Sequence, residues 1–245
     1  MEIRPAQAAT GQARLPRRTC GFSLLEVLLS IALLTVVTGA IFNQIILMQR
    51  KTAAEGMKVD SSQQAREFID QMVRDIHMAG YPKASMYAAN PNNTSPLVAV
   101  GLVRISPTQI TLEGDVNNEG VVYSVTTTYV ASDPADPNCP CIRRSALPKV
   151  AADPLSQPVS PYYTETEHVL PPGAGGTGED LFAFYDQNGV KLPVDGGKDF
   201  FNDASFMSKI RTVKINLSLL TTEVAAGAGE ATSRTSLTAT ARLNQ

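Results

Sequence analysis

Residues 21 to 48 read GFSLLEVLLSIALLTVVTGAIFNQIILM, an apolar run in which Glu26 is the one ionisable residue. The 22 residues from Val27 to Met48 would extend about 33 Å as a helix, enough to cross a hydrocarbon core of about 30 Å. No A-x-A-like cleavage site of a secretory signal ends the run, which passes into polar sequence at Gln49. The run therefore predicts a membrane-spanning helix over residues 22 to 48.

Basic residues flank this helix on both sides. Arg14, Arg17 and Arg18 precede it, and Arg50 and Lys51 follow it. The three preceding arginines predict, by the positive-inside rule, that the N-terminus is cytoplasmic and the rest of the chain lies outside. Arg50 and Lys51 weaken this asymmetry.

A carboxylate near the end of a membrane span needs a reason, because intramembrane charges are costly and usually functional. One reason is local: Ser23 and Glu26 have capping-box spacing, and an acid in the first turn suits the helix dipole. The other is that cleavage after Gly21 frees the amine of Phe22, and Glu26 pairs with such an amine. The two interpretations are compatible.

These residues resemble the class III signal of type IV prepilins and type II secretion pseudopilins. The resemblance implies cleavage between Gly21 and Phe22 by the prepilin peptidase, N-methylation of Phe22, and packing of the helices into a filament core. It also implies that Glu26 neutralises the Phe22 amine of a neighbouring subunit. A leader of residues 1 to 21 is longer than usual, so either it is genuine or the true start lies downstream.

Residues 49 to 79 are predicted to continue the helix, now amphipathic and in water. Six apolar residues recur at helical spacing and form a stripe: Ala65, Phe68, Ile69, Met72, Val73 and Ile76. The opposite face is predicted to be solvated: Arg66, Glu67, Asp70, Gln71, Arg74 and Asp75. Gly80 and Pro82 end the helix, because glycine favours the conformation that follows a helix and proline cannot continue one.

After Pro82 the sequence changes to short runs of β-branched and aromatic residues, which predict a β-rich head over residues 80 to 245. Eight runs are predicted strands: 98–105, 109–112, 121–130, 141–146, 181–185, 190–194, 210–220 and 236–243. Asn188-Gly189 predicts a hairpin turn, and residues 83–97 and 148–179 predict loops. The predicted fold class is α+β, a long N-terminal helix packed on an antiparallel β-sheet.

Residues 66 to 81, REFIDQMVRDIHMAGY, resemble the PilW group of minor pilins, as do the later VVYSV and FAFYDQNG segments. The resemblance implies a minor pilin that primes assembly of a type IV pilus and joins it, with other minor and major pilins as partners. It implies a single-pass inner-membrane protein before assembly and a surface filament afterwards, of the kind that serves twitching motility and cell adhesion. A minor pseudopilin of a type II secretion system, related to pseudopilin J, is one alternative. A stand-alone membrane-anchored β domain that is never cleaved is the other.

The residue patterns of an enzyme are missing from this sequence. His77 at a helix end and His168 in a loop are interpreted as structural or solvated, and residues 173 to 178, GAGGTG, as a linker without the lysine of a phosphate loop. Removing four arginines and one glutamate with the leader lowers the formal charge from −2 to −5, which does not favour nucleic acid as a partner. We expect no enzyme activity and no cofactor.

The mature chain keeps two cysteines, Cys139 and Cys141, because Cys20 leaves with the leader. Outside the cytoplasm the pair is expected to form a local disulfide, to stay as free thiols or to pair between molecules; these alternatives stay open. No metal site is expected. The two groups of acids that invite a calcium interpretation are more simply turn residues: Asp186 and Asn188 with Asp195 and Asp199, and Asp115 and Asn117 with Glu119.

Overall fold

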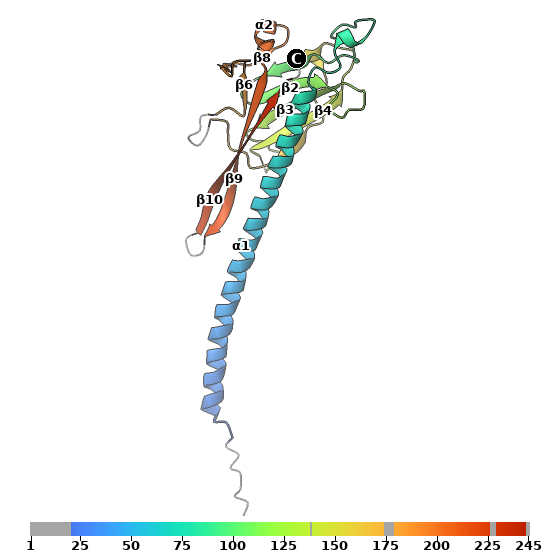
Figure 1. Cartoon of the computed structure of the whole chain (residues 1–245). Coiled ribbons are helices and arrows are strands. Elements are labelled where there is room, and N and C mark those ends of the chain that lie inside the picture. Colours follow the sequence, from blue (N-terminus) through green and yellow to red (C-terminus); the bar gives the residue numbers. More distant parts are fainter. Residues whose placement is uncertain (1–20, 138, 174–178, 226–228, 244–245) are drawn as a thin grey trace, which may run out of the picture. The chain divides into compact units, whose positions relative to one another are not determined.

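The computed structural model describes residues 21–137, 139–173, 179–225 and 229–243 (Figure 1). Residues 1–20 of the predicted leader and residues 174–178 of the glycine-rich run lie outside these ranges, so both remain predictions. The chain divides into two units, Met1–Met48 and Gln49–Gln245. One long helix, α1 (Leu24–Met78), contributes its apolar half to the first unit and its amphipathic half to the second.

The head within the second unit is built on two antiparallel sheets. Its strands are β1 (Gly101–Ile105), β2 (Gln109–Gly114), β3 (Tyr123–Val130), β4 (Cys141–Pro148), β5 (Tyr163–Thr166), β6 (Phe182–Tyr185), β7 (Lys191–Leu192), β8 (Lys198–Asp199), β9 (Thr212–Ala225) and β10 (Gly229–Arg242). The six-stranded sheet has the order β5-β4-β3-β2-β1-β8, and the four-stranded sheet the order β10-β9-β6-β7. The described residues also form three short helices: η1 (Ala84–Met86) between α1 and β1, η2 (Pro154–Ser156) between β4 and β5, and α2 (Ala204–Met207) between β8 and β9.

The α+β class is confirmed, but the strands form two sheets where the sequence predicted one. Each of the eight predicted runs contains a strand, and the hairpin at Asn188-Gly189 joins β6 to β7. The additional strands β5 and β8 lie at sheet edges, and β5 falls inside the segment predicted as a loop. Four and two residues are too few to show an alternating pattern, and β5 and β8 lack the Asn-Gly turn that marked the equally short β6 and β7.

The predicted apolar stripe is the face by which α1 packs on the head. Ala65, Phe68, Ile69, Met72 and Ile76 are buried in one core cluster with residues from both sheets, and Val73 packs at its margin. The helix crosses the six-stranded sheet, since Met72 contacts Thr127 of β3 and Ala79 bridges Gly114 of β2 (Figure 1). Burial of the stripe holds this half of α1 on the sheet.

Asp75 corrects the predicted solvated face. Its side chain is fully buried and pairs with Arg144 of β4, although the sequence placed it in water. Its position follows from helical geometry, because it lies three residues after Met72 and seven after Phe68 on the packed face. A charge is tolerated there because the sheet supplies a cation.

The end of α1 is fastened to β2 through the backbone. Gly80 has a φ of +82° and donates its N–H to the carbonyl oxygen of Glu113 at 2.9 Å, which confirms the predicted helix end. Gly114 lies directly against Met78, and a Cβ at that position would overlap the Met78 carbonyl oxygen. Glycine at 114 therefore allows the close approach of helix and strand.

Candidate processing and assembly site

Gly21 and Phe22 lie just before the first turn of α1. Phe22 is 78% exposed, and a Cβ built on Gly21 would meet no atom within 4 Å. The described fold therefore gives no packing reason for a glycine at this position. A requirement for glycine there would come from recognition by another molecule.

Among the described residues, the helix start shows no side-chain bond of a capping box. The amides of Glu26 and Val27 donate to the carbonyl oxygen of Ser23 at 2.9 and 3.2 Å, which satisfies two N-terminal donors through the backbone. Within the described residues no hydrogen bond or ion pair reaches the Glu26 carboxylate. The acid is thus exposed and available in the first turn of the helix.

The apolar half of α1 is exposed over its whole described length. Every residue from Leu24 to Met48 is exposed, and α1 is the described helix that is long and apolar enough, by length and composition, to cross a membrane. Leaving one such large side chain in water forgoes about 1.5–3 kcal/mol of burial. A surface of this extent needs lipid or other protein chains to cover it.

A buried ion pair adds a polar link between α1 and the sheet. Arg144 donates through Nε and Nη2 to Oδ2 of Asp75 at 3.0 and 2.9 Å, and Gln71 donates to Oδ1 at 2.7 Å. Burial raises the pKa of Asp75, while Arg144 acts in the opposite direction. Burial likewise raises the pKa of Glu165 on β5, and the charge of Arg144 offsets part of that rise. One arginine therefore serves two desolvated acids.

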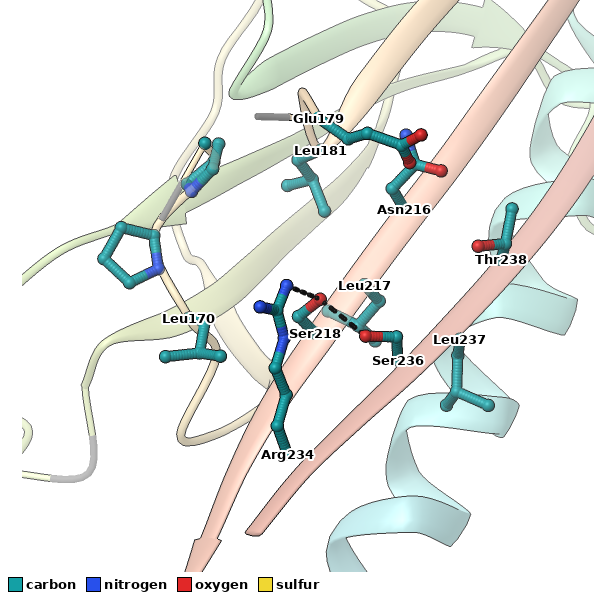
Figure 2. Close-up of a pocket in the computed structure, with 13 residues that line it drawn as sticks. Leu170, Glu179, Leu181, Asn216, Leu217, Ser218, Arg234, Ser236, Leu237 and Thr238 are labelled. Atoms are coloured by element: carbon teal, nitrogen blue, oxygen red, sulfur yellow. Dashed lines mark hydrogen bonds between the residues drawn. The ribbon is translucent and has the colours of Figure 1, made fainter. Parts of the chain in front are cut away.

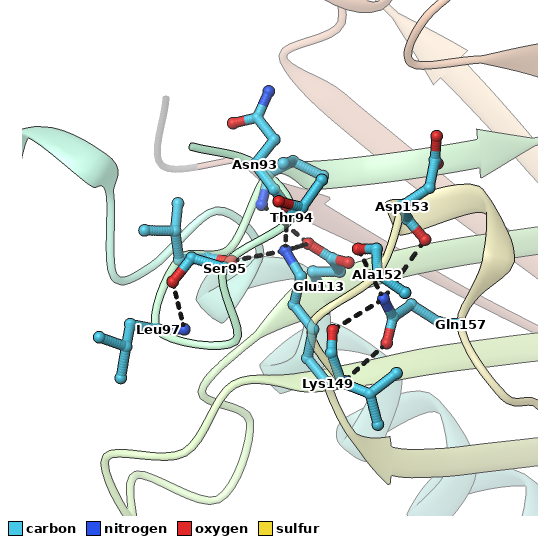
Figure 3. Close-up of polar contacts among 12 residues, drawn as sticks. Asn93, Thr94, Ser95, Leu97, Glu113, Lys149, Ala152, Asp153 and Gln157 are labelled. Carbon is cyan, nitrogen blue, oxygen red and sulfur yellow. Dashed lines mark hydrogen bonds and ion pairs between the residues drawn. The ribbon is translucent and has the colours of Figure 1, made fainter. Parts of the chain in front are cut away.

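A second buried pair ties the loop after α1 to the sheet (Figure 3). Lys149 donates its three ammonium protons to the Asn93 and Val98 carbonyl oxygens and to Glu113 Oε2, each at 2.7 Å. Both charged side chains are fully buried, and burial raises the pKa of Glu113 against the lowering effect of Lys149. Sequence reasoning missed this pair because no local pattern links residues 36 positions apart.

Cys139 and Cys141 are joined in the structure as a disulfide across Pro140, in the connection between β3 and β4. Arg143 of β4 pairs with Asp133 and Asp136 of the same connection. The Ala135 amide and Arg143 lower the pKa of Asp133. Ion pairs and the disulfide thus fasten the same loop.

The acids considered as calcium ligands make the bonds expected of turn residues. Asp186 Oδ1 accepts from the amides of Asn188 and Val190, and these bonds lower its pKa. Asp115 accepts from the amides of Glu119 and Gly120. In both turns the carboxylate replaces backbone acceptors.

A small pocket lies between β9, β10 and the segment that leads to β6 (Figure 2). Arg234 donates to Ser218 Oγ at 3.2 Å, and the hydroxyls of Ser218 and Ser236 lie 3.1 Å apart. Its described lining contains neither histidine nor cysteine, and its acid Glu179 is paired with Lys214. These residues do not form a nucleophile beside an activating base.

A model of the prokaryotic N-terminal methylation motif matches residues 16–42, the segment that holds Gly21, Phe22 and Glu26. The motif supports a type IV pilin-like protein or pseudopilin, processed by prepilin peptidase and assembled with other pilins at the membrane. With the pilin-like fold, it indicates a structural subunit rather than an enzyme. No curated protein and no solved structure matches the chain.

Proposed function

We propose that this chain is a minor pilin that primes assembly of a type IV pilus and becomes part of the filament. The observation that carries the proposal is the methylation motif on a helix whose apolar first half, residues 24 to 48, is wholly exposed. Such a helix can lie first in a bilayer and then in a bundle of like helices. The second unit, which begins at residue 49, has its own hydrophobic core. In this proposal the N-terminus starts in the cytoplasm and the head outside it.

In this function the peptidase cuts between Gly21 and Phe22, and the new amine of Phe22 is methylated. The exposed position of both residues and the lack of a packing role for Gly21 support recognition by an enzyme. Intact-mass measurement of the protein from membranes tests this step. A mass that still includes residues 1 to 21, in cells with an active peptidase, contradicts it.

Glu26 would then pair with the Phe22 amine of a neighbouring subunit as the helix enters the filament. Support comes from its exposed carboxylate, which has no partner within the described residues, and from the cost of an unpaired acid in a bilayer, about 2.5–3.5 kcal/mol at the centre and less near the interface where Glu26 lies. Pairing would remove part of that cost. The pair would therefore favour assembly over free diffusion in the membrane.

The test compares two glutamates on the same helix. Glu26→Leu is expected to insert and be cleaved normally but to be depleted from sheared filaments, measured by quantitative mass spectrometry. Glu55→Leu is the matched control, because Glu55 is exposed and pairs with Lys51 one turn away. Equal recovery of Glu26→Leu and wild type in filaments would leave only the helix-start role for Glu26.

Deleting the gene separates the pilus from the alternative secretion system. A minor pilin predicts loss of surface pili and of twitching, with secretion of exported enzymes unchanged. If the chain is a pseudopilin, the deletion should abolish secretion of exported enzymes and leave surface pili and twitching unchanged. Crosslinking from an engineered cysteine on the exposed part of α1 would then identify the neighbouring pilins.

The proposed location of the head outside the cytoplasm predicts that Cys139 and Cys141 are oxidised in the exported protein. Alkylation of unreduced protein followed by mass spectrometry should add no label to either residue. Labelling of both thiols in protein from intact envelopes would contradict the disulfide. A mass corresponding to a crosslinked dimer would instead show intermolecular pairing.

A further inference from the structure

The disulfide between Cys139 and Cys141 closes a very short loop, because Pro140 alone separates the two cysteines. In the loop-entropy account, a disulfide stabilises a protein by restricting its unfolded chain, and this gain falls as the closed loop becomes shorter. The connection between β3 and β4 is also fastened by other bonds, since Arg143 pairs with Asp133 and Asp136. Global stability therefore gives little reason for this disulfide, and its effect should be local.

The residue between the two cysteines makes a contact that joins the two sheets. The carbonyl oxygen of Pro140, directly before β4, accepts a hydrogen bond from the Val169 amide at 2.8 Å. Val169 is 2% exposed and bridges Leu219 of β9, and backbone hydrogen bonds on either side of that bridge extend the pairing. Because β4 and β9 belong to different sheets, the Pro140–Val169 bond is a link between them.

Another backbone link between the sheets has no disulfide in its chain neighbourhood. Phe182, the first residue of β6, donates its N–H to the carbonyl oxygen of Pro107, in the turn between β1 and β2, at 3.1 Å. The buried stripe of α1 also shares one core cluster with residues of both sheets. These contacts should hold the sheets together when the disulfide is open. The Phe182 amide is therefore an internal reference for the Val169 amide.

The two sulfurs of the disulfide differ in their access to other molecules. Cys141 is fully buried at the start of β4, whereas Cys139 lies in the loop and keeps part of its surface exposed. Cys139 Sγ lies 4.0 Å from Nη2 of Arg143 and 3.9 Å from Oδ2 of Asp136. In the reduced protein the carboxylate can accept the thiol proton, while the guanidinium favours the thiolate. Since thiol–disulfide exchange needs a thiolate that can reach the other disulfide, it should begin at Cys139.

We propose that oxidation of this pair is a closing step in the maturation of the head, with Cys139 as the sulfur that reacts first. The Cys139 thiolate attacks a donor disulfide, forms a mixed disulfide and releases one donor sulfur as a thiolate. Cys141, after losing its proton, attacks Cys139 Sγ and releases the second donor sulfur. The cysteine pair loses two electrons, the donor gains them, and the two thiol protons pass to the donor thiolates.

The product fixes the Pro140 carbonyl oxygen opposite the Val169 amide and so tightens this link between the sheets. The donor is identified by its chemistry, a reducible disulfide in an oxidising compartment. The inference therefore rests on the proposed location of the head outside the cytoplasm. Its two tests use the purified mature chain in detergent micelles, so their outcomes do not depend on whether the chain assembles into a pilus.

The first test asks which sulfur reacts first. Cys141→Ala retains Cys139, and Cys139→Ala retains Cys141; each variant is incubated with oxidised glutathione, and the mixed disulfide is followed by intact mass. The variant that retains Cys139 should react at least about tenfold faster, because its sulfur is in the more accessible position. Circular dichroism checks that both variants are folded. Equal rates, or faster reaction of the variant that retains Cys141, would overturn the assigned order.

The second test uses the wild-type sequence and measures amide hydrogen exchange by NMR, before and after reduction with dithiothreitol. Reduction should speed exchange of the Val169 amide about tenfold and leave that of the Phe182 amide within about twofold. The double variant Cys139→Ala/Cys141→Ala should exchange as the reduced protein does. An unchanged rate at Val169, or the same acceleration at both amides, would show that the disulfide does not hold this link and would overturn the proposal.

Discussion

Replacing Lys149 with methionine should be one of the most damaging single substitutions in the head. Lys149 Nζ satisfies three acceptors at 2.7 Å, and its partner Glu113 is fully buried, with Oε1 receiving no bond from the part of the chain that the structure describes. Methionine would fill the space but leave the Glu113 carboxylate with the Val100 amide in place of a cation, and it would remove the lysine donor from two carbonyl oxygens. Breaking a buried pair from one side costs about 3–5 kcal/mol, and we expect a loss of that size at neutral pH.

The loss of stability in Lys149→Met should also depend on pH, and the burial of Glu113 determines whether it grows or shrinks as pH rises. Its pKa is already raised above the ordinary 4.5 by burial, and removing Lys149 removes the effect that lowers it. Between pH 4.5 and the folded-state pKa of Glu113, the folded protein binds the Glu113 proton more tightly than the unfolded chain does. Stability therefore falls as pH rises through that window. The gap between wild type and Lys149→Met should therefore be smaller at about pH 5 than at about pH 8.

The assay is urea unfolding of the mature chain in detergent micelles, followed by circular dichroism at both pH values. Lys191→Met is the matched control, because the Lys191–Asp180 pair is 48% and 30% exposed and should contribute less than about 1 kcal/mol. Adding Glu113→Gln to Lys149→Met should recover part of the loss at the higher pH. A variant as stable as wild type, or a penalty that grows on acidification, would refute the reasoning.

The same unfolding assay tests three further contacts. Phe68→Ala should cost about 3–5 kcal/mol because the ring is fully buried under the sheet; unchanged stability would assign that face to contacts with other subunits. Gly114→Ala should cost about 1–3 kcal/mol because its Cβ would overlap the Met78 carbonyl oxygen, whereas Gly56→Ala, with open space around it, should be neutral or stabilising. Arg144→Met should cost about 3–5 kcal/mol, because it leaves the fully buried Asp75 without its cation. Asp75→Asn should cost less, because the Arg144 that it leaves behind is 14% exposed and can still be hydrated. The opposite order of the two losses would contradict this account.

Local periodicity accounts for the parts of this protein that the sequence predicted well. An apolar run long enough for a bilayer, a helical stripe around Phe68 and Met72, and the Gly80 stop each depend on residues within a few turns of one another. The strand positions followed from alternation and turn residues for the same reason. The predictions for Gly21, Phe22 and Glu26 were also local, because these residues lie within the short linear segment that the methylation motif matches, and their roles stay predictions.

The tertiary structure alone decided which distant residues meet. The partners of Asp75 and Glu113 lie 69 and 36 residues away, so neither buried pair leaves a mark in a local window. The division into two sheets likewise depends on which strand neighbours which, and alternation gives the face of a residue but not the identity of its neighbour. The apolar half of α1 is the converse case: its sequence alone determined its chemistry, and the structure adds that each residue from Leu24 to Met48 is exposed, so that this surface awaits lipid or other chains.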